Sequence, residues 1–238
     1  MGRSIFIGDV HGCALELAEM FERLGPTGDD EVYLVGDLVA RGPDTAGVLR
    51  LAREVGAQAV RGNHEQRLLE VREAQREGEP GPHLGAGHWQ LFKSLTEEQW
   101  EQLASLPFTI EVPTHQIRVV HAGLVPGVPL ELQKVSHFTR LRTIRPDGQP
   151  STRLGGRLWG ELWSGPPHIV FGHNAITGLQ LHTDATGIDT GCVYGGQLSA
   201  LVLPHGSAIP PVEHRRDFIV SVPAHERYYV PGTSPHEP

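Results

Sequence analysis

Side chains that bind metal ions recur directly after short apolar runs in this sequence. Five runs rich in Ile and Val end in this way, in the motifs GDVHG, GDLVARG, GNHE, HAG and FGH. Aspartate, asparagine and histidine offer the oxygen and nitrogen donors that suit Mn, Fe, Co, Ni or Zn, and one carboxylate can bridge two ions. A single D-x-H is usually a turn aspartate and a surface histidine, but the whole set predicts a metal centre. Its predicted ligands are Asp9, His11, Asp37, Asn63, His121 and His173.

Two more residues beside these motifs have chemistry of their own. His64 follows Asn63, and we assign it to proton donation, because an imidazole bound to a metal cannot also be a free proton donor. The alternative is a histidine that only supports the ligands. Arg41 carries a permanent planar charge and is predicted to bind phosphate, with a surface salt bridge as the alternative. Metal ions, an acid and an arginine together predict hydrolysis at phosphorus.

Buried strands must bring these residues together. Runs of this length and composition suit the middle of a covered sheet, and ligands gather at the carboxyl ends of strands in open α/β sheets. In four of the five runs a glycine precedes the ligand, and glycine permits positive φ and close backbone approach. Between the first three runs the apolar spacing predicts two helices, so this part reads βαβαβ. The predicted apolar faces are Leu15, Leu17, Met20, Phe21 and Leu24 on the first helix, and Val48, Leu49 and Ala52 on the second.

The rest of the chain continues with a charged helix over 65–77, a turn-rich loop, and a helix pair over 88–105. The segments FTIEV, IRVVH, HIVFG, LQLH and QLSALVL then predict a second sheet. We expect a catalytic domain over 1–205 and a C-terminal extension over 206–238, in which RRDFIVSVPAHERYYV can add an edge strand. The remaining histidines have no spacing that assigns them a role, and they include His83, His88, His115, His182 and His214.

The amino-acid composition of the chain limits the kinds of molecule to which it can bind. The 238 residues are 39% hydrophobic, enough to bury a core, and the charges sum to 20 − 28 = −8. An acidic chain has no broad basic surface for DNA, so phosphate chemistry needs a local positive centre.

No apolar run approaches the ~20 residues of a membrane span, and the first residues lack a signal-peptide core. With only Cys13 and Cys192, no disulfide framework is expected. We therefore expect a cytoplasmic protein without DNA or membrane partners; the oligomeric state stays open.

Taken together, the five motifs resemble the phosphoprotein phosphatase branch of the calcineurin-like metallophosphoesterases. The resemblance implies an α/β fold, a β-sandwich flanked by helices in four α/β/β/α layers. It also implies two divalent ions, with manganese the first choice and Co, Fe, Ni or Zn the alternatives. One ion would be held by Asp9, His11 and Asp37, and the other by Asp37, Asn63, His121 and His173.

Two departures and one further similarity narrow the choice of subfamily. Ala175 stands where phosphodiesterases and nucleases carry a further histidine. Ala40 stands where protein phosphatases carry an aspartate that orients the catalytic histidine, so no orienting residue for His64 is implied. GDLVARGP, FTRLR and DTGCVYGGQLSAL are instead similar to symmetrical diadenosine tetraphosphatases, which implies hydrolysis of a dinucleoside tetraphosphate to two nucleoside diphosphates.

If the chain acts on a dinucleoside tetraphosphate, Arg140 and Arg142 are expected to bind a second phosphate beside the one at Arg41. The candidate catalytic residues are then His64, Arg41 and Arg140. Weak hydrolysis of phosphomonoesters is expected as a side activity. The first alternative is a serine/threonine or tyrosine phosphoprotein phosphatase, and the second is a non-catalytic scaffold on the same fold.

Overall fold

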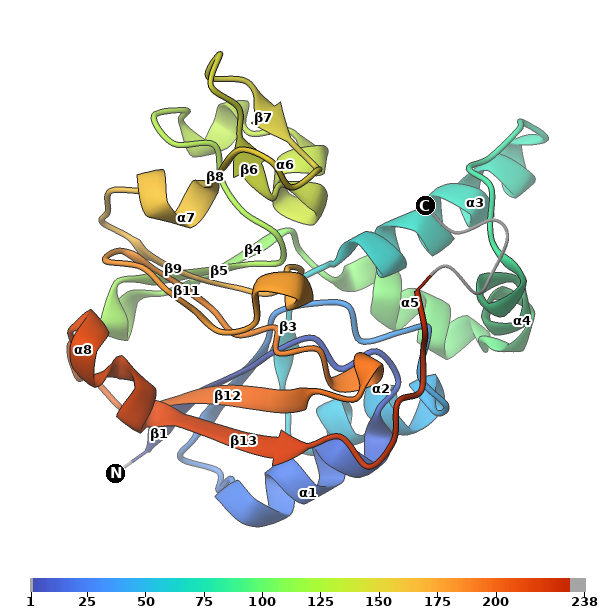
Figure 1. Ribbon diagram of the computed structural model, residues 1–238. Coiled ribbons are helices and arrows are strands. Elements are labelled where there is room, and N and C mark those ends of the chain that lie inside the picture. The colour runs from blue at the N-terminus through green and yellow to red at the C-terminus, as the bar shows by residue number, and fades with distance from the viewer. Residues whose placement is uncertain (1, 232–238) are drawn as a thin grey trace.

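Two five-stranded sheets lie face to face, and helices cover the outer face of each (Figure 1). The computed structural model describes residues 2–231. The strand order is β13-β12-β1-β2-β3 in the first sheet and β10-β11-β9-β5-β4 in the second. These layers are the α/β/β/α sandwich that the sequence predicts, so the expected fold class is confirmed.

The first sheet contains the predicted βαβαβ unit. Strands β1 (Arg3–Ile7), β2 (Glu31–Leu34) and β3 (Gln58–Ala59) run parallel, and helices α1 (Ala14–Leu24) and α2 (Thr45–Glu54) connect them. Side chains of β1 alternate between two cores, as the period of two of a strand requires. Ile5 and Ile7 pack in the core beneath α1 and α2, whereas Phe6 packs in the core between the two sheets.

The ends of the two connecting helices match their sequence signals. The side chain of Asp44 accepts the backbone N–H of Gly47 at 2.7 Å and so caps α2, and Gly25 ends α1 with φ of 52°. The prediction that Leu15 belongs to the buried face of the first helix is wrong, because its side chain is 63% exposed. It lies in the first turn of α1, on the side away from the buried face that Leu17, Met20 and Phe21 form.

The second sheet consists of β4 (Thr109–Val112), β5 (Ile117–Val120), β9 (His168–Phe171), β10 (Gln180–Leu181) and β11 (Ala185–Gly187). The expectation that QLSALVL joins this sheet is wrong. It forms β12 (Gln197–Pro204), which pairs antiparallel with β1, Phe6 lying opposite Leu201. Strand pairing depends on long-range contacts that the local apolar pattern does not specify.

Helices complete the outer layers and one flank. Trp159 of α7 (Trp159–Leu162) and Phe138 of α6 (Val135–Arg140) pack on the outer face of the second sheet, in a core with Ile169 and Phe171. A small third sheet of β6 (Thr143–Ile144), β7 (Pro150–Ser151) and β8 (Arg157–Leu158) lies beyond them. The flank is formed by α3 (Asn63–Glu77), α4 (Ala86–Ser94) and α5 (Glu97–Ser105), which correspond to the helices expected there (Figure 1).

The C-terminal part returns to the first sheet. After α8 (Val212–Arg215), β13 (Ile219–Pro223) pairs antiparallel with β12 as the edge strand. The following segment runs back over α1, where Glu16 accepts the backbone N–H of His225 and the hydroxyl of Tyr228, each at 2.8 Å. Residues 232–238 of the expected extension lie outside the described part. Within residues 2–231 no helix combines the length and apolarity that crossing a membrane requires.

Candidate active site

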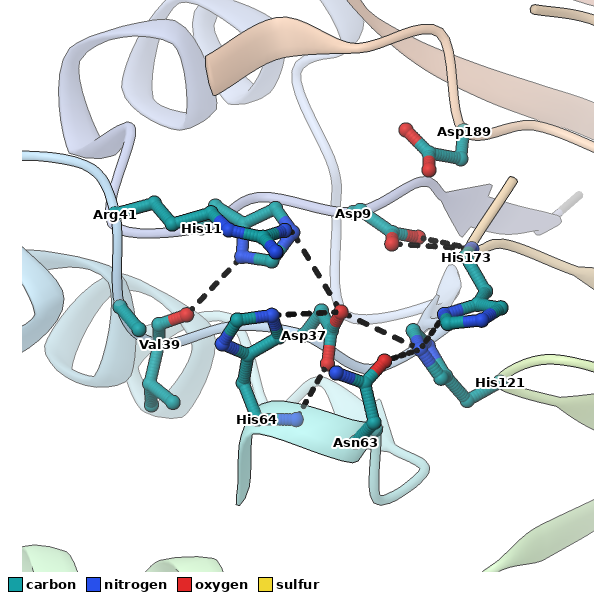
Figure 2. A network of polar contacts seen from close by, with 12 residues as sticks. Asp9, His11, Asp37, Val39, Arg41, Asn63, His64, His121, His173 and Asp189 are labelled. Carbon is teal, nitrogen blue, oxygen red and sulfur yellow. Dashed lines mark hydrogen bonds and ion pairs between the residues drawn. The ribbon is translucent and has the colours of Figure 1, made fainter. Parts of the chain in front are cut away.

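All six predicted metal ligands meet where strands of the two sheets end (Figure 2). Asp9 and His11 follow β1, Asp37 follows β2, and Asn63 opens α3 just after β3. From the second sheet, His121 follows β5 and His173 follows β9. The carboxyl ends of parallel strands share one edge of a sheet, and the facing of the two sheets brings both edges to one point.

Asp37 lies at the centre of this cluster and is 2% exposed. Its Oδ2 atom lies 3.3 Å from His121 Nε2, 3.5 Å from His11 Nε2 and 4.0 Å from His64 Nε2. Its Oδ1 atom accepts the backbone N–H of His64 at 3.0 Å. Burial would raise the pKa of Asp37, but His121 and His64 hold it well below the ordinary value. The central group is therefore an anion surrounded by imidazoles.

Ring nitrogens of two histidines are oriented by backbone carbonyls. His121 Nδ1 lies 2.9 Å from the Val35 oxygen, and His11 Nδ1 lies 3.1 Å from the Val39 oxygen. A proton on each Nδ1 leaves each Nε2 with a lone pair directed at Asp37. His121 Nε2 also lies 3.1 Å from Asn63 Oδ1 and 3.2 Å from His173 Nδ1. Several atoms with lone pairs thus face one another without a proton between them. A divalent cation placed among them would accept these lone pairs as its ligands.

The electrostatics agree with a cation site. Burial lowers the pKa of His11 to about 4, and burial together with His121 lowers that of His173 well below its usual range, so both rings are neutral. For His121, burial lowers the pKa while Asp37 and Glu65 raise it, and the net direction is upward. The negative charge of Asp37 therefore favours a positive charge on its neighbours, whether a protonated histidine or a bound cation.

A second concentration of carboxylates lies around Asp9. Its oxygens accept the backbone N–H of His173 at 3.0 and 3.1 Å, and it is 3% exposed. Burial and the negative charges of Asp189 and Asp37 raise the pKa of Asp9 well above its ordinary value. Asp189 follows β11, the same position relative to a strand as the predicted ligands, although the DTGC segment that contains it indicates only a family resemblance at the level of sequence. Its position after an apolar strand was the signal that would have identified it.

Glu65 of the GNHE motif joins two ligand loops, a role the sequence analysis did not assign. Its carboxylate accepts the backbone N–H groups of Asp37 (3.1 Å), Leu38 (2.8 Å), Val39 (3.1 Å) and Gly62 (2.8 Å). Backbone strain accumulates in the same loop, because Asp37, Ala40 and Arg41 have positive φ. Three of these hydrogen bonds hold the strained loop in place, and the fourth connects it to the loop that contains Gly62.

Close approach explains two of the glycines before the ligands. A Cβ atom at Gly172 would lie 1.9 Å from Asp9 Oδ1, and one at Gly62 would lie 2.2 Å from Asp37 Oδ1. Any larger residue would displace a predicted ligand.

His64 contacts a histidine to which we had assigned no role. His64 Nδ1 lies 2.8 Å from His88 Nε2, and the two rings stack with centroids 4.9 Å apart and planes at 18°. Burial lowers the pKa of His64 well below its ordinary value, so in these surroundings the ring is neutral. His88 lies on α4 and is buried. Only its place on a predicted helix was evident from sequence, because a lone histidine carries no spacing signal.

Arg41 reaches into the site between two tyrosines. Its Nη1 lies 3.2 Å from His11 Nε2, and its guanidinium carbon lies 5.6 Å from the Tyr194 ring centroid and 5.3 Å from that of Tyr229. Among the described residues it forms no ion pair with a carboxylate, and its Nε is buried without a hydrogen-bond partner. The arrangement leaves a buried donor beside the predicted metal ligands.

Arginines line the cavity that includes part of this cluster. The cavity has a volume of about 1080 Å³, and Asp37, Asn63 and His64 are among the residues that line it. Arg142 donates from Nη1 to Asn174 Oδ1 at 2.7 Å. Six arginines line the cavity: Arg41, Arg67, Arg140, Arg142, Arg153 and Arg227.

Comparison with known proteins identifies the family. The model of the calcineurin-like phosphoesterases matches residues 2–205, and this chain belongs to that family. It is thus a metal-dependent hydrolase that acts on phosphate esters or anhydrides. A serine/threonine-protein phosphatase 1 of Salmonella typhimurium is 33% identical over 81% of this chain and 88% of its own length. A symmetrical bis(5'-nucleosyl)-tetraphosphatase of Burkholderia mallei is 30% identical over 84% of this chain and 89% of its own length.

Solved structures agree with this assignment. The crystal structure of a candidate diadenosine tetraphosphatase is 36% identical, covers 94% of each chain and superposes with a TM-score of 0.79. A serine/threonine phosphatase of Saccharomyces cerevisiae is 14% identical, covers 94% of this chain and 80% of its own, and has a TM-score of 0.59. The second similarity shows the fold alone.

Proposed function

We propose that this protein hydrolyses dinucleoside tetraphosphates symmetrically and converts diadenosine tetraphosphate into two ADP. The observation that carries the proposal is the set of six arginines that line the cavity. The chain as a whole has a charge of −8, so this concentration of positive charge is local. A tetraphosphate carries several negative charges in a row that several guanidinium groups can bind, whereas a phosphomonoester has a single phosphate group. A cavity of about 1080 Å³ is also large for a single phosphate group.

We further propose that two divalent ions, manganese by first choice, are held by the six ligands. Asp9, His11 and Asp37 would hold one ion, and Asp37, Asn63, His121 and His173 the other. The donor set supports this, because lone pairs of His11 and His121 face the carboxylate of Asp37. When bound, the ions would supply Lewis-acid charge that acidifies water and neutralises phosphate oxygens.

The residues of the chain would then act at distinct atoms. Arg41 is suited to the oxygens of the reacting phosphate, because its buried Nε donor has no partner within residues 2–231. Arg140 and Arg142 would bind the neighbouring phosphate. His64 would protonate the leaving oxygen, and the negative charge of a bound polyphosphate favours the protonated form of its ring.

A substrate panel tests the proposal. The metal-loaded protein is assayed on diadenosine tetraphosphate, an aryl phosphate and phosphopeptides, and the products are separated by ion exchange. We expect rapid cleavage of the dinucleotide with ADP as the product, and weak cleavage of the aryl phosphate. AMP plus ATP would mean that the substrate binds one phosphate out of register and that the roles of Arg41 and Arg140 are wrong.

The second candidate is a phosphoprotein phosphatase. Its support is the 33% identity to the Salmonella phosphatase over 81% of this chain. Ala40 weighs against it, because the branch that acts on proteins typically carries aspartate there. Rapid turnover of phosphopeptides with an untouched dinucleotide would establish this candidate instead. The scaffold alternative has no support, since all six predicted ligands are present and clustered.

A further inference from the structure

His64 is held at two points, one on its backbone and one on its ring. The backbone N–H donates to Asp37 Oδ1 at 3.0 Å, which fixes where the side chain starts. The two side-chain torsions, χ1 and χ2, then decide which ring atoms face Asp37 and His88. Nδ1 contacts His88 Nε2 at 2.8 Å while Nε2 faces Asp37 Oδ2 at 4.0 Å. Turning the ring over would exchange both nitrogens for carbons and lose the contact with His88.

Ala40 of the 37–41 loop offers no side-chain hydrogen bond to this ring. Ala40 is 4% exposed, has a methyl side chain, and donates its backbone N–H to Thr45 Oγ1 at 3.3 Å. His88 instead arrives from α4, a different element, and both rings are buried, at 4% and 6% exposure. A buried hydrogen bond between stacked rings restricts rotation more than an exposed one, because water cannot replace the partner.

We propose that His88 is the positioning residue of His64, holding the ring so that Nε2 is presented to the leaving oxygen. The proposal rests on the proposed role of His64 as proton donor. In the protonated ring, Nδ1–H donates to His88 Nε2, and His88 keeps its own proton on Nδ1. His64 then loses only the Nε2 proton: that N–H bond breaks, an O–H bond forms on the leaving group, and the Nδ1–H hydrogen bond to His88 persists.

Substitutions of His88 can distinguish a role in orienting the His64 ring from a role in packing alone. The contact uses Nε2 of His88, the far nitrogen, so glutamine can place an amide near the same point and asparagine cannot. We expect H88A and H88N to lower kcat about 10- to 100-fold with little change in KM, and H88Q to recover most of it. Q90A removes a polar side chain from the exposed side of the same helix and should leave kcat unchanged.

The leaving group supplies the decisive readout. Across aryl phosphates, the loss in H88A should be large for poor leaving groups and shrink for good ones, because good ones need no proton. A merely structural defect would slow all of them equally, and that result would overturn the proposal. The double variant H64N/H88A should be no slower than H64N, since a positioning residue has no effect without the group it positions.

The results also distinguish a failure of the role of His88 from a failure of the proposed function. If H64N slows turnover with both metals retained but H88A does not, only the positioning role of His88 fails. If H64N is as fast as the unmodified protein, the acid assignment in the proposed function fails first. If aryl phosphates show the expected dependence while diadenosine tetraphosphate is not cleaved, the role of His88 stands and the substrate assignment falls.

Discussion

Asp37 binds the backbone of His64 with one carboxylate oxygen and faces the Nε2 atoms of His121 and His11 with the other, at 3.0 Å, 3.3 Å and 3.5 Å. The proposed acid and both halves of the proposed metal centre therefore meet at one side chain. Any change of this carboxylate should disturb all three.

We predict that D37N abolishes activity more completely than any single arginine substitution. An amide is a weaker ligand and removes the negative charge that the surrounding histidines face. Metal content per chain should fall along with kcat, as measured by elemental analysis after gel filtration. Near-normal turnover with two metals still bound would contradict the central role of Asp37.

Arg41 and Arg140 should respond differently to truncation. R41A is expected to lower turnover of every substrate, because Arg41 is assigned to the reacting phosphate. R140A should impair diadenosine tetraphosphate more than an aryl phosphate, because its assigned phosphate exists only in the polyphosphate. The measurement is kcat/KM on both substrates, and equal losses for R140A would remove its assigned role.

Tyr229 should contribute to the site from the C-terminal segment. Its backbone N–H donates to the Val193 oxygen at 3.0 Å, and its ring lies against the guanidinium of Arg41. A cation–π contact of about 0.5–2 kcal/mol predicts a loss of kcat/KM of about 2- to 30-fold in Y229A. Y229F keeps the ring and should keep the activity. A loss in Y229F as large as that in Y229A would show that the hydroxyl matters and not the ring.

His168 should make the fold sensitive to acid, far from the proposed centre. Burial, with the charge of Arg215, lowers its pKa to about 3, and its Nε2 lies 2.9 Å from Thr186 Oγ1. The ordinary value in the unfolded chain is about 6.5. The neutral ring therefore stabilises the fold fully above pH about 6.5, and this contribution is lost as pH falls toward 3.

The corresponding measurement is the free energy of unfolding by urea between pH 7 and pH 5. H168Q can still hydrogen-bond to Thr186 but does not titrate. Its unfolding free energy should fall less over this interval, by about 1–2 kcal/mol. Identical pH profiles of the two proteins would contradict the buried, neutral state of His168.

Local pattern was sufficient for most strands of the two large sheets, for the connecting helices and for the side chains that meet at the proposed metal centre. An apolar run that ends in glycine and a metal-binding side chain is a property of a few neighbouring residues. The meeting of Asp9, Asp37, Asn63, His121 and His173 could therefore be expected before any contact was known, because parallel strands carry their carboxyl ends to the same edge. The cap at Asp44 and the helix end at Gly25 are equally local signals.

Only the tertiary structure decided which distant groups meet. The pairing of β12 with β1, and not with the second sheet, follows from contacts between residues nearly 200 positions apart. His88 reaches His64 because α4 packs beside the site, and Glu65 finds four backbone N–H groups because two loops converge on it. Tyr229 reaches Arg41 only because the chain returns over α1. A single residue has no periodicity, so its partners depend on the packing of whole elements and not on its neighbours in sequence.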